Sequence, residues 1–165
     1  MRSRLRKFIL TTHIVFSVGW LGAVVAYLVL ALTGLNSQDI KIVNAVYLSM
    51  ELIGWRAIVP LCLAAFLSGV IQALVTPWGL FRHFWIVTKL GLTAISTFIL
   101  LKHMPTVSRM ASMVQDAQSS SADFGIIPKQ LVIHAGGGLL VLLVITVISV
   151  YKPWGMTSYG RRKQK

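Results

Sequence analysis

Four histidines are the residues of this chain whose type and placement could do chemistry. His13 and His134 each lie inside a long apolar stretch, close to its start. His83 and His103 stand at the two ends of a third apolar stretch. Neutral imidazole is a common ligand of heme iron and of transition metals. An ionisable side chain inside a membrane segment marks a functional site by default, so these histidines predict a cofactor or metal site.

The elements that must position these histidines are membrane-spanning helices. The chain has 165 residues, of which 56% are hydrophobic, whereas soluble domains average about 45–50%. Four apolar stretches approach or exceed the ~20 residues that a helix needs to cross a bilayer: residues 8–32, 57–75, 84–101 and 131–151. The second is expected to extend upstream as a helix from Ile40. Because backbone groups in lipid must be hydrogen-bonded within their own segment, we predict an all-α four-transmembrane-helix bundle, with residues 1–165 as a single integral membrane domain.

Basic residues set the expected orientation of these helices. The formal net charge is +12, and the basic residues gather before the first apolar stretch and after the fourth. This distribution differs from the basic face of a soluble nucleic-acid-binding domain, so we expect no nucleic acid as a partner. Lys and Arg are enriched in the cytoplasmic flanks of membrane proteins. We therefore predict cytoplasmic N- and C-termini in a multi-pass protein of the bacterial inner (plasma) membrane, with the lipid bilayer as a partner.

In this orientation the histidines form two pairs at different depths. His13 and His83 belong to the cytoplasmic half of the membrane, and His103 and His134 belong to the outer half. Histidines on facing helices of a bundle can hold a cofactor between them. The pattern therefore predicts a bis-histidine b-type heme in each half, or one heme in a single half. Such a protein would be a membrane b-type cytochrome that moves electrons between a quinol or redox protein and an acceptor.

Cationic and small residues near the histidines could complete such sites. Arg82 and Lys89 lie near the inner pair and Arg56 lies near the outer pair, where they could bind heme propionates or tune the reduction potential. Gly138 follows His134 by one helical turn and so lies on the same face. This glycine makes room either for a flat cofactor or for a neighbouring helix.

Two other functions compete with heme binding. The first is the handling of copper or another metal, because thioether and imidazole suit Cu(I) and the connection after the third span contains His103, Met104, Met110 and Met113. The same methionines also suit the apolar face of an amphipathic helix on the outer membrane surface. The second is a cofactor-free membrane scaffold or partner subunit. A homo-oligomer is compatible with each of these functions, and no residue pattern identifies an enzyme.

Several segments of the chain resemble known membrane proteins. The stretches THIVFSVGWLGAVVAYLVLAL, TPWGLFRHFWIVTKLGLT, LKHMPTVSRMA and HAGGGLLVLLVITVISVYKPWG resemble a group of small bacterial four-span membrane proteins of unassigned function. More distantly, HIVFSVGWLGA is similar to the first-helix histidine and Trp-x-Gly pattern of CopD-like copper-resistance domains and of heme-binding HemJ-like protoporphyrinogen oxidases. This resemblance implies a four-helix bundle with a first-helix histidine, here His13, that binds heme b.

Overall fold

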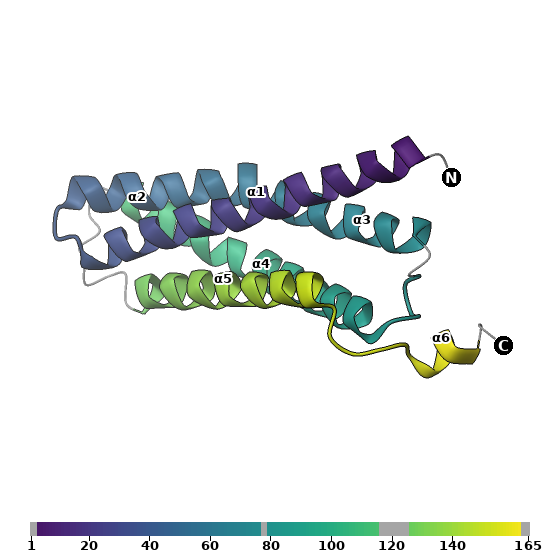
Figure 1. The fold of residues 1–165 in the computed structure, drawn as a ribbon. Coiled ribbons are helices and arrows are strands. Elements are labelled where there is room, and N and C mark those ends of the chain that lie inside the picture. The colour runs from purple at the N-terminus through teal and green to yellow at the C-terminus, as the bar shows by residue number, and fades with distance from the viewer. Residues whose placement is uncertain (1–2, 77–78, 116–125, 163–165) are drawn as a thin grey trace.

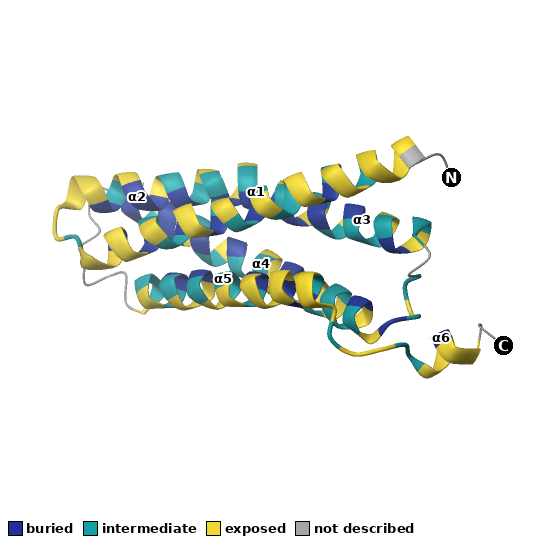
Figure 2. Cartoon of the chain, in the orientation of Figure 1, coloured by how far each residue is buried: buried dark blue, intermediate teal, exposed yellow. Residues whose placement is uncertain are grey.

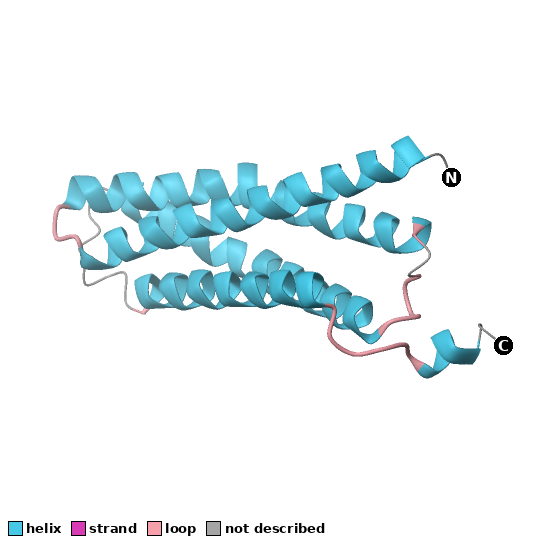
Figure 3. Cartoon of the chain, viewed as in Figure 1, coloured by secondary structure: helices cyan, strands magenta, loops and turns pink. Residues whose placement is uncertain are grey.

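The chain folds into a bundle of long helices. The computed structural model describes residues 3–76, 79–115 and 126–162, and these residues form no β-strand (Figure 3). Four helical segments are long and apolar enough to cross a membrane, which confirms the predicted all-α membrane fold. The helices are α1 (Ser3–Asn36), α2 (Ile40–Ile53), α3 (Val59–Val75), α4 (Phe84–Gln115), α5 (Ile127–Tyr151) and the short α6 (Ser158–Arg162) (Figure 1).

The second span is one continuous helical path, as predicted from Ile40 onward. α2 begins where the carboxylate of Asp39 accepts a hydrogen bond from the backbone N–H of Lys41 at 2.9 Å, a stabilising N-cap. Between α2 and α3 lies a π-helical turn, η1 (Gly54–Ile58), just before Pro60. Because proline lacks an N–H and its ring crowds the carbonyl four residues earlier, a locally widened helix is the expected adjustment.

Both termini lie at the same end of the bundle (Figure 1). We term this the terminal end, and the opposite end, where α1 connects to α2, the distal end. At the terminal end the segment after α5 folds back onto the connection between α3 and α4. The backbone N–H of Thr157 donates to the carbonyl oxygen of Arg82 at 3.0 Å. Gly160 packs so closely here that a Cβ would collide with the same carbonyl oxygen.

The distal end contains the tightest packing of the bundle. Figure 2 shows buried residues of α1 and α2 facing one another there. The largest fully buried side chains are Tyr47, Met50, Met104, Val107, Met110 and Leu131, together with Cys62 farther along α3. All but Cys62 lie on the distal portions of α2, α4 and α5, so the distal end has a core like that of a soluble helix bundle.

The segment after the third apolar stretch contributes much of this core. α4 continues through Pro105 as a single helix to Gln115, so residues 104–114 do not form a separate helix. The amphipathic pattern predicted there is real, and its apolar face packs inside the bundle against α2 rather than on the membrane surface. The buried residues of this face are Met104, Val107, Met110, Ala111 and Val114.

Candidate functional site

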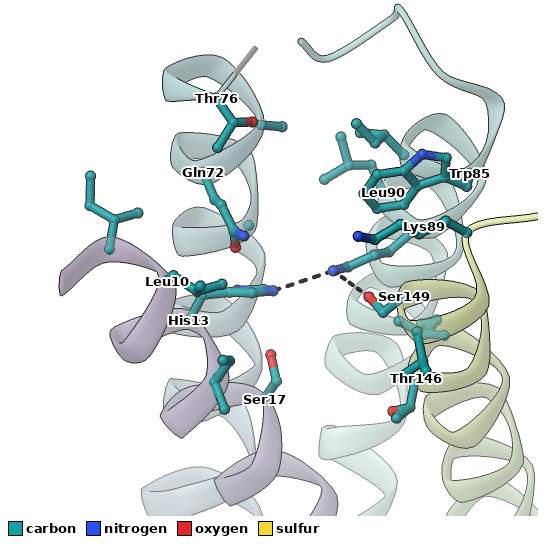
Figure 4. A pocket seen from close by; sticks show the side chains of 18 of the residues that line it. Leu10, His13, Ser17, Gln72, Thr76, Trp85, Lys89, Leu90, Thr146 and Ser149 are labelled. Atoms are coloured by element: carbon teal, nitrogen blue, oxygen red, sulfur yellow. Dashed lines mark hydrogen bonds between the residues drawn. The ribbon is translucent and has the colours of Figure 1, made fainter. Parts of the chain in front are cut away.

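A cavity opens between the helices at the terminal end. Its volume is about 590 Å³, within the range of ~300–1,000 Å³ that is typical of small-molecule and cofactor sites. α1 and α3 form one wall, and α4 and α5 form the other (Figure 4). We term this cavity the terminal slot, because it separates two pairs of helices.

The terminal slot is positively charged. Arg6, Lys89 and Lys152 line it, and none of the described lining residues is acidic. The ammonium of Lys152 also lies 6.0 Å from the centroid of the Trp85 ring. Ionisable groups within a membrane usually have a partner of opposite charge. Since the described lining offers no carboxylate, an anionic ligand with apolar surface is the kind of molecule that this slot fits best.

Two polar side chains meet across the slot. Nε2 of His13, on α1, lies 3.5 Å from Nζ of Lys89, on α4 (Figure 4). The Lys89 amine also donates a hydrogen bond to the hydroxyl of Ser149, on α5, at 2.8 Å. A bridge of side chains therefore crosses the slot and links the two helix pairs.

The hydrogen bonds around His13 define which ring nitrogen carries the proton. Nδ1 of His13 lies 3.0 Å from the hydroxyl of Ser68 on α3. The Ser68 hydroxyl donates to the carbonyl oxygen of Ala65 at 3.2 Å, so its oxygen accepts from Nδ1–H of His13. The lone pair is then on Nε2, which faces the slot. Metal-binding histidines are commonly oriented in this way, with the second nitrogen donating to a protein oxygen.

A glycine gives the His13 ring its space. A Cβ on Gly69 would lie 3.1 Å from Cε1 of His13, so even an alanine there would press on the ring.

A second cavity, of about 50 Å³, adjoins the same bridge and is lined by His13, Lys89, Trp20 and Thr93 among others. The His13–Lys89 bridge therefore has open volume on more than one side.

The predicted inner pair of histidines is not brought together. His83 does not line the terminal slot. It precedes α4 and pairs through its backbone with Met156 in an isolated antiparallel β-bridge, where the segment after α5 folds back. Lys89 lies six residues farther along the chain, about 1.7 helical turns deeper, and it takes the place opposite His13 that we predicted for His83.

The predicted outer pair lies together, but in a geometry that does not fit a heme. The rings of His103 and His134 stack with centroids 4.0 Å apart and an interplanar angle of 16°. Nδ1–H of His134 donates to the carbonyl oxygen of Gln130 at 2.7 Å. Axial ligation needs ring nitrogens that point at each other across the iron, whereas stacked rings leave no gap for a macrocycle. A distal heme therefore stays a prediction that this arrangement does not support.

The other predicted site residues lie outside the terminal slot. Arg56 is exposed on η1, and Arg82 lies in the connection between α3 and α4. A Cβ on Gly138 would meet nothing within 4 Å, so no neighbouring helix closes onto this glycine. Among the described residues no group of three or more His, Cys, Asp and Glu could hold a metal ion, and Met104 and Met110 are buried in the distal core.

Sequence reasoning missed four residues of the site. Arg6 and Lys152 belong to the basic flanks that predict the orientation of the helices, and Ser68 and Ser149 are not among the predicted site residues. The two serines offered a signal in the sequence: each places a hydroxyl within a predicted span, at about the depth of a titratable residue on another helix.

Comparison with known proteins gives no relative from which a function could be transferred. No family model, no curated protein and no solved structure matches the chain.

Proposed function

We propose that this membrane-embedded protein binds one b-type heme in the terminal slot, with His13 as an axial ligand, and serves in electron transfer. The observation that carries the proposal is the Nε2 lone pair of His13, which faces a cavity of about 590 Å³ with basic residues and no described acidic residue in its lining. Heme combines the three properties that this slot selects: an apolar body, negative charge on its propionates, and a metal that binds imidazole.

Each part of the slot has a role in this proposal. Ser68 orients the His13 ring and favours the tautomer with the proton on Nδ1, because its hydroxyl oxygen accepts a hydrogen bond from that nitrogen. Apolar side chains of the walls exclude water from the body of the ligand. Arg6 and Lys152 supply positive charge at the terminal end, where propionates would be solvated. When bound, heme supplies a one-electron couple whose potential depends on ligands, burial and nearby charge.

Absorption spectroscopy of the purified protein tests this proposal. The chain is expressed with ample heme, and its spectrum is recorded before and after reduction with dithionite. We expect a sharp reduced α-band in the wild type and its loss in His13→Ala. His134→Ala is the matched control, since it removes an imidazole from the distal end, and it should keep the band.

Two results would contradict the proposed function. A wild-type spectrum without heme bands would remove the cofactor altogether. A His13→Ala variant that keeps the wild-type heme content would remove the assigned ligand. Loss of heme in His134→Ala alone would move the site to the distal end.

A further inference from the structure

We infer that Lys89 is the second axial ligand, so that the iron would lie between a histidine on one wall of the terminal slot and a lysine on the other. The inference rests on the proposed heme site and gives Lys89 a role different from binding a propionate. Two positions for a propionate partner are already provided by Arg6 and Lys152 in the lining. The Lys89 amine instead points across the slot at Nε2 of His13 (Figure 4).

The distance between the two nitrogens suits a shared metal. Nζ of Lys89 and Nε2 of His13 are 3.5 Å apart. Metal–nitrogen bonds to histidine are about 2.0–2.1 Å long, so two such bonds on opposite sides of a metal need roughly 4 Å between the nitrogens. A widening of the slot by about half an ångström would therefore admit the metal, which is within the reach of a flexible lysine side chain.

The orientation of the bridge suits a flat macrocycle. The line from His13 to Lys89 runs from one helix pair to the other, so a ring perpendicular to that line lies in the plane of the slot. Open volume adjoins the bridge in two places, the slot itself and the smaller cavity of about 50 Å³. The slot offers space for most of the ring, and the smaller cavity continues it toward Trp20 and Thr93.

Ser149 holds the lysine in place for this role. Its hydroxyl accepts a hydrogen bond from the Lys89 amine at 2.8 Å and directs the side chain from α4 toward the slot. Ligation uses the lone pair of the neutral amine, so a protonated Lys89 would release one proton to the open slot as the bond to iron forms. The bond replaces the contact with His13, and the bond to Ser149 can persist.

The test is the spin state of ferric heme in variants of Lys89. With both axial positions filled by nitrogen, we expect the wild type to be six-coordinate and low-spin by absorption and electron paramagnetic resonance. Lys89→Leu keeps an apolar side chain in this place but removes the amine and offers no atom that binds iron, so it should give high-spin heme with the heme retained. Lys102→Leu removes a lysine of the same helix that does not line the slot, and should stay low-spin.

Two further measurements distinguish the loss of a ligand from misfolding of the variant. Lys89→His should restore a low-spin spectrum, because imidazole can replace the amine. Free imidazole added to Lys89→Leu should do the same. Low-spin heme in Lys89→Leu without imidazole, or high-spin heme in the wild type, would overturn the assignment of Lys89 while leaving heme binding through His13 intact. A wild type without heme would instead refute the proposed function and this inference together.

Discussion

The two ends of the bundle use the same helices in opposite ways. At the distal end Tyr47, Met50 and Met110 are fully buried, and a Cβ on Gly34 would lie 2.8 Å from the Tyr47 ring. At the terminal end the helix pairs enclose a slot of about 590 Å³ that is crossed by His13 and Lys89. The difference indicates that the distal end holds the bundle together, while the terminal end keeps space for a ligand.

The connections and helix lengths explain this division. α1 and α2 are joined by a short connection at residues 37–39, and α4 extends beside α2 toward the distal end, so apolar faces of three helices meet there. At the terminal end the chain places polar and charged side chains on facing walls. Close packing of those walls would bury the basic groups among apolar side chains, which is costly in a membrane.

Substitutions that shorten apolar side chains should destabilise the protein far more at the distal end than at the terminal end. Met110→Ala removes a fully buried side chain from the distal core and should lower the free energy of unfolding by about 2–5 kcal/mol. Leu90→Ala, in the lining of the terminal slot, should cost clearly less, because its side chain already borders open volume. Thermal unfolding in detergent followed by circular dichroism measures both. Equal losses for the two variants would contradict the concentration of packing at the distal end.

Two glycines, Gly69 beside the terminal slot and Gly138 near the distal histidines, distinguish the two ends by their effect on heme binding. Gly69→Ala places a Cβ 3.1 Å from the His13 ring and should weaken heme binding about tenfold, equivalent to ~1.4 kcal/mol. Gly138→Ala meets open space and should leave heme affinity unchanged, with helix stability raised by up to ~1 kcal/mol. Heme titration of the apoprotein gives both affinities. A loss of affinity in Gly138→Ala would show that this glycine, and the distal site it was predicted to serve, takes part in binding.

Removing the positive charge of Arg6 or Lys152 should change heme affinity only slightly. Arg6→Gln and Lys152→Gln should each weaken heme binding by about 0.2–1 kcal/mol, since both side chains are exposed and screened by solvent. These losses should shrink as salt is added. Arg56→Gln serves as the control, because Arg56 lies on η1 outside the slot, and should have no effect on heme affinity. An effect of Arg56→Gln equal to the other two would break the assignment of propionate binding to the terminal end.

The fold followed from the sequence because apolar length and the need to satisfy backbone hydrogen bonds leave few alternatives in a membrane. The spacing of apolar residues in 104–114 also predicted an amphipathic helix. Its partner was not predictable, because the same apolar face can rest on lipid or on α2, and only the tertiary arrangement decides. The orientation of the termini and the resemblance to CopD-like and HemJ-like domains stay predictions.

The site was only half predictable from the sequence. His13 stood out because an ionisable ring in an apolar span is rare. Its partner could not be chosen, since His83 and Lys89 are close together in sequence and the relative register of α1 and α4 decides which of them faces His13. The stacking of His103 on His134 likewise depends on the crossing of α4 and α5. The position of a residue within a span predicts its depth in the membrane. The rotation of one helix relative to another depends on tertiary packing, which the sequence alone does not predict.

The number of hemes per chain tests the central contrast between the two ends most directly. Heme is extracted from the purified wild-type protein, measured as its pyridine complex, and divided by the protein concentration from amino-acid analysis. The proposed terminal site, together with the closed distal stack, predicts one heme per chain in the wild type and in His134→Ala, and none in His13→Ala. Two hemes per chain, or one that survives in His13→Ala, would contradict it.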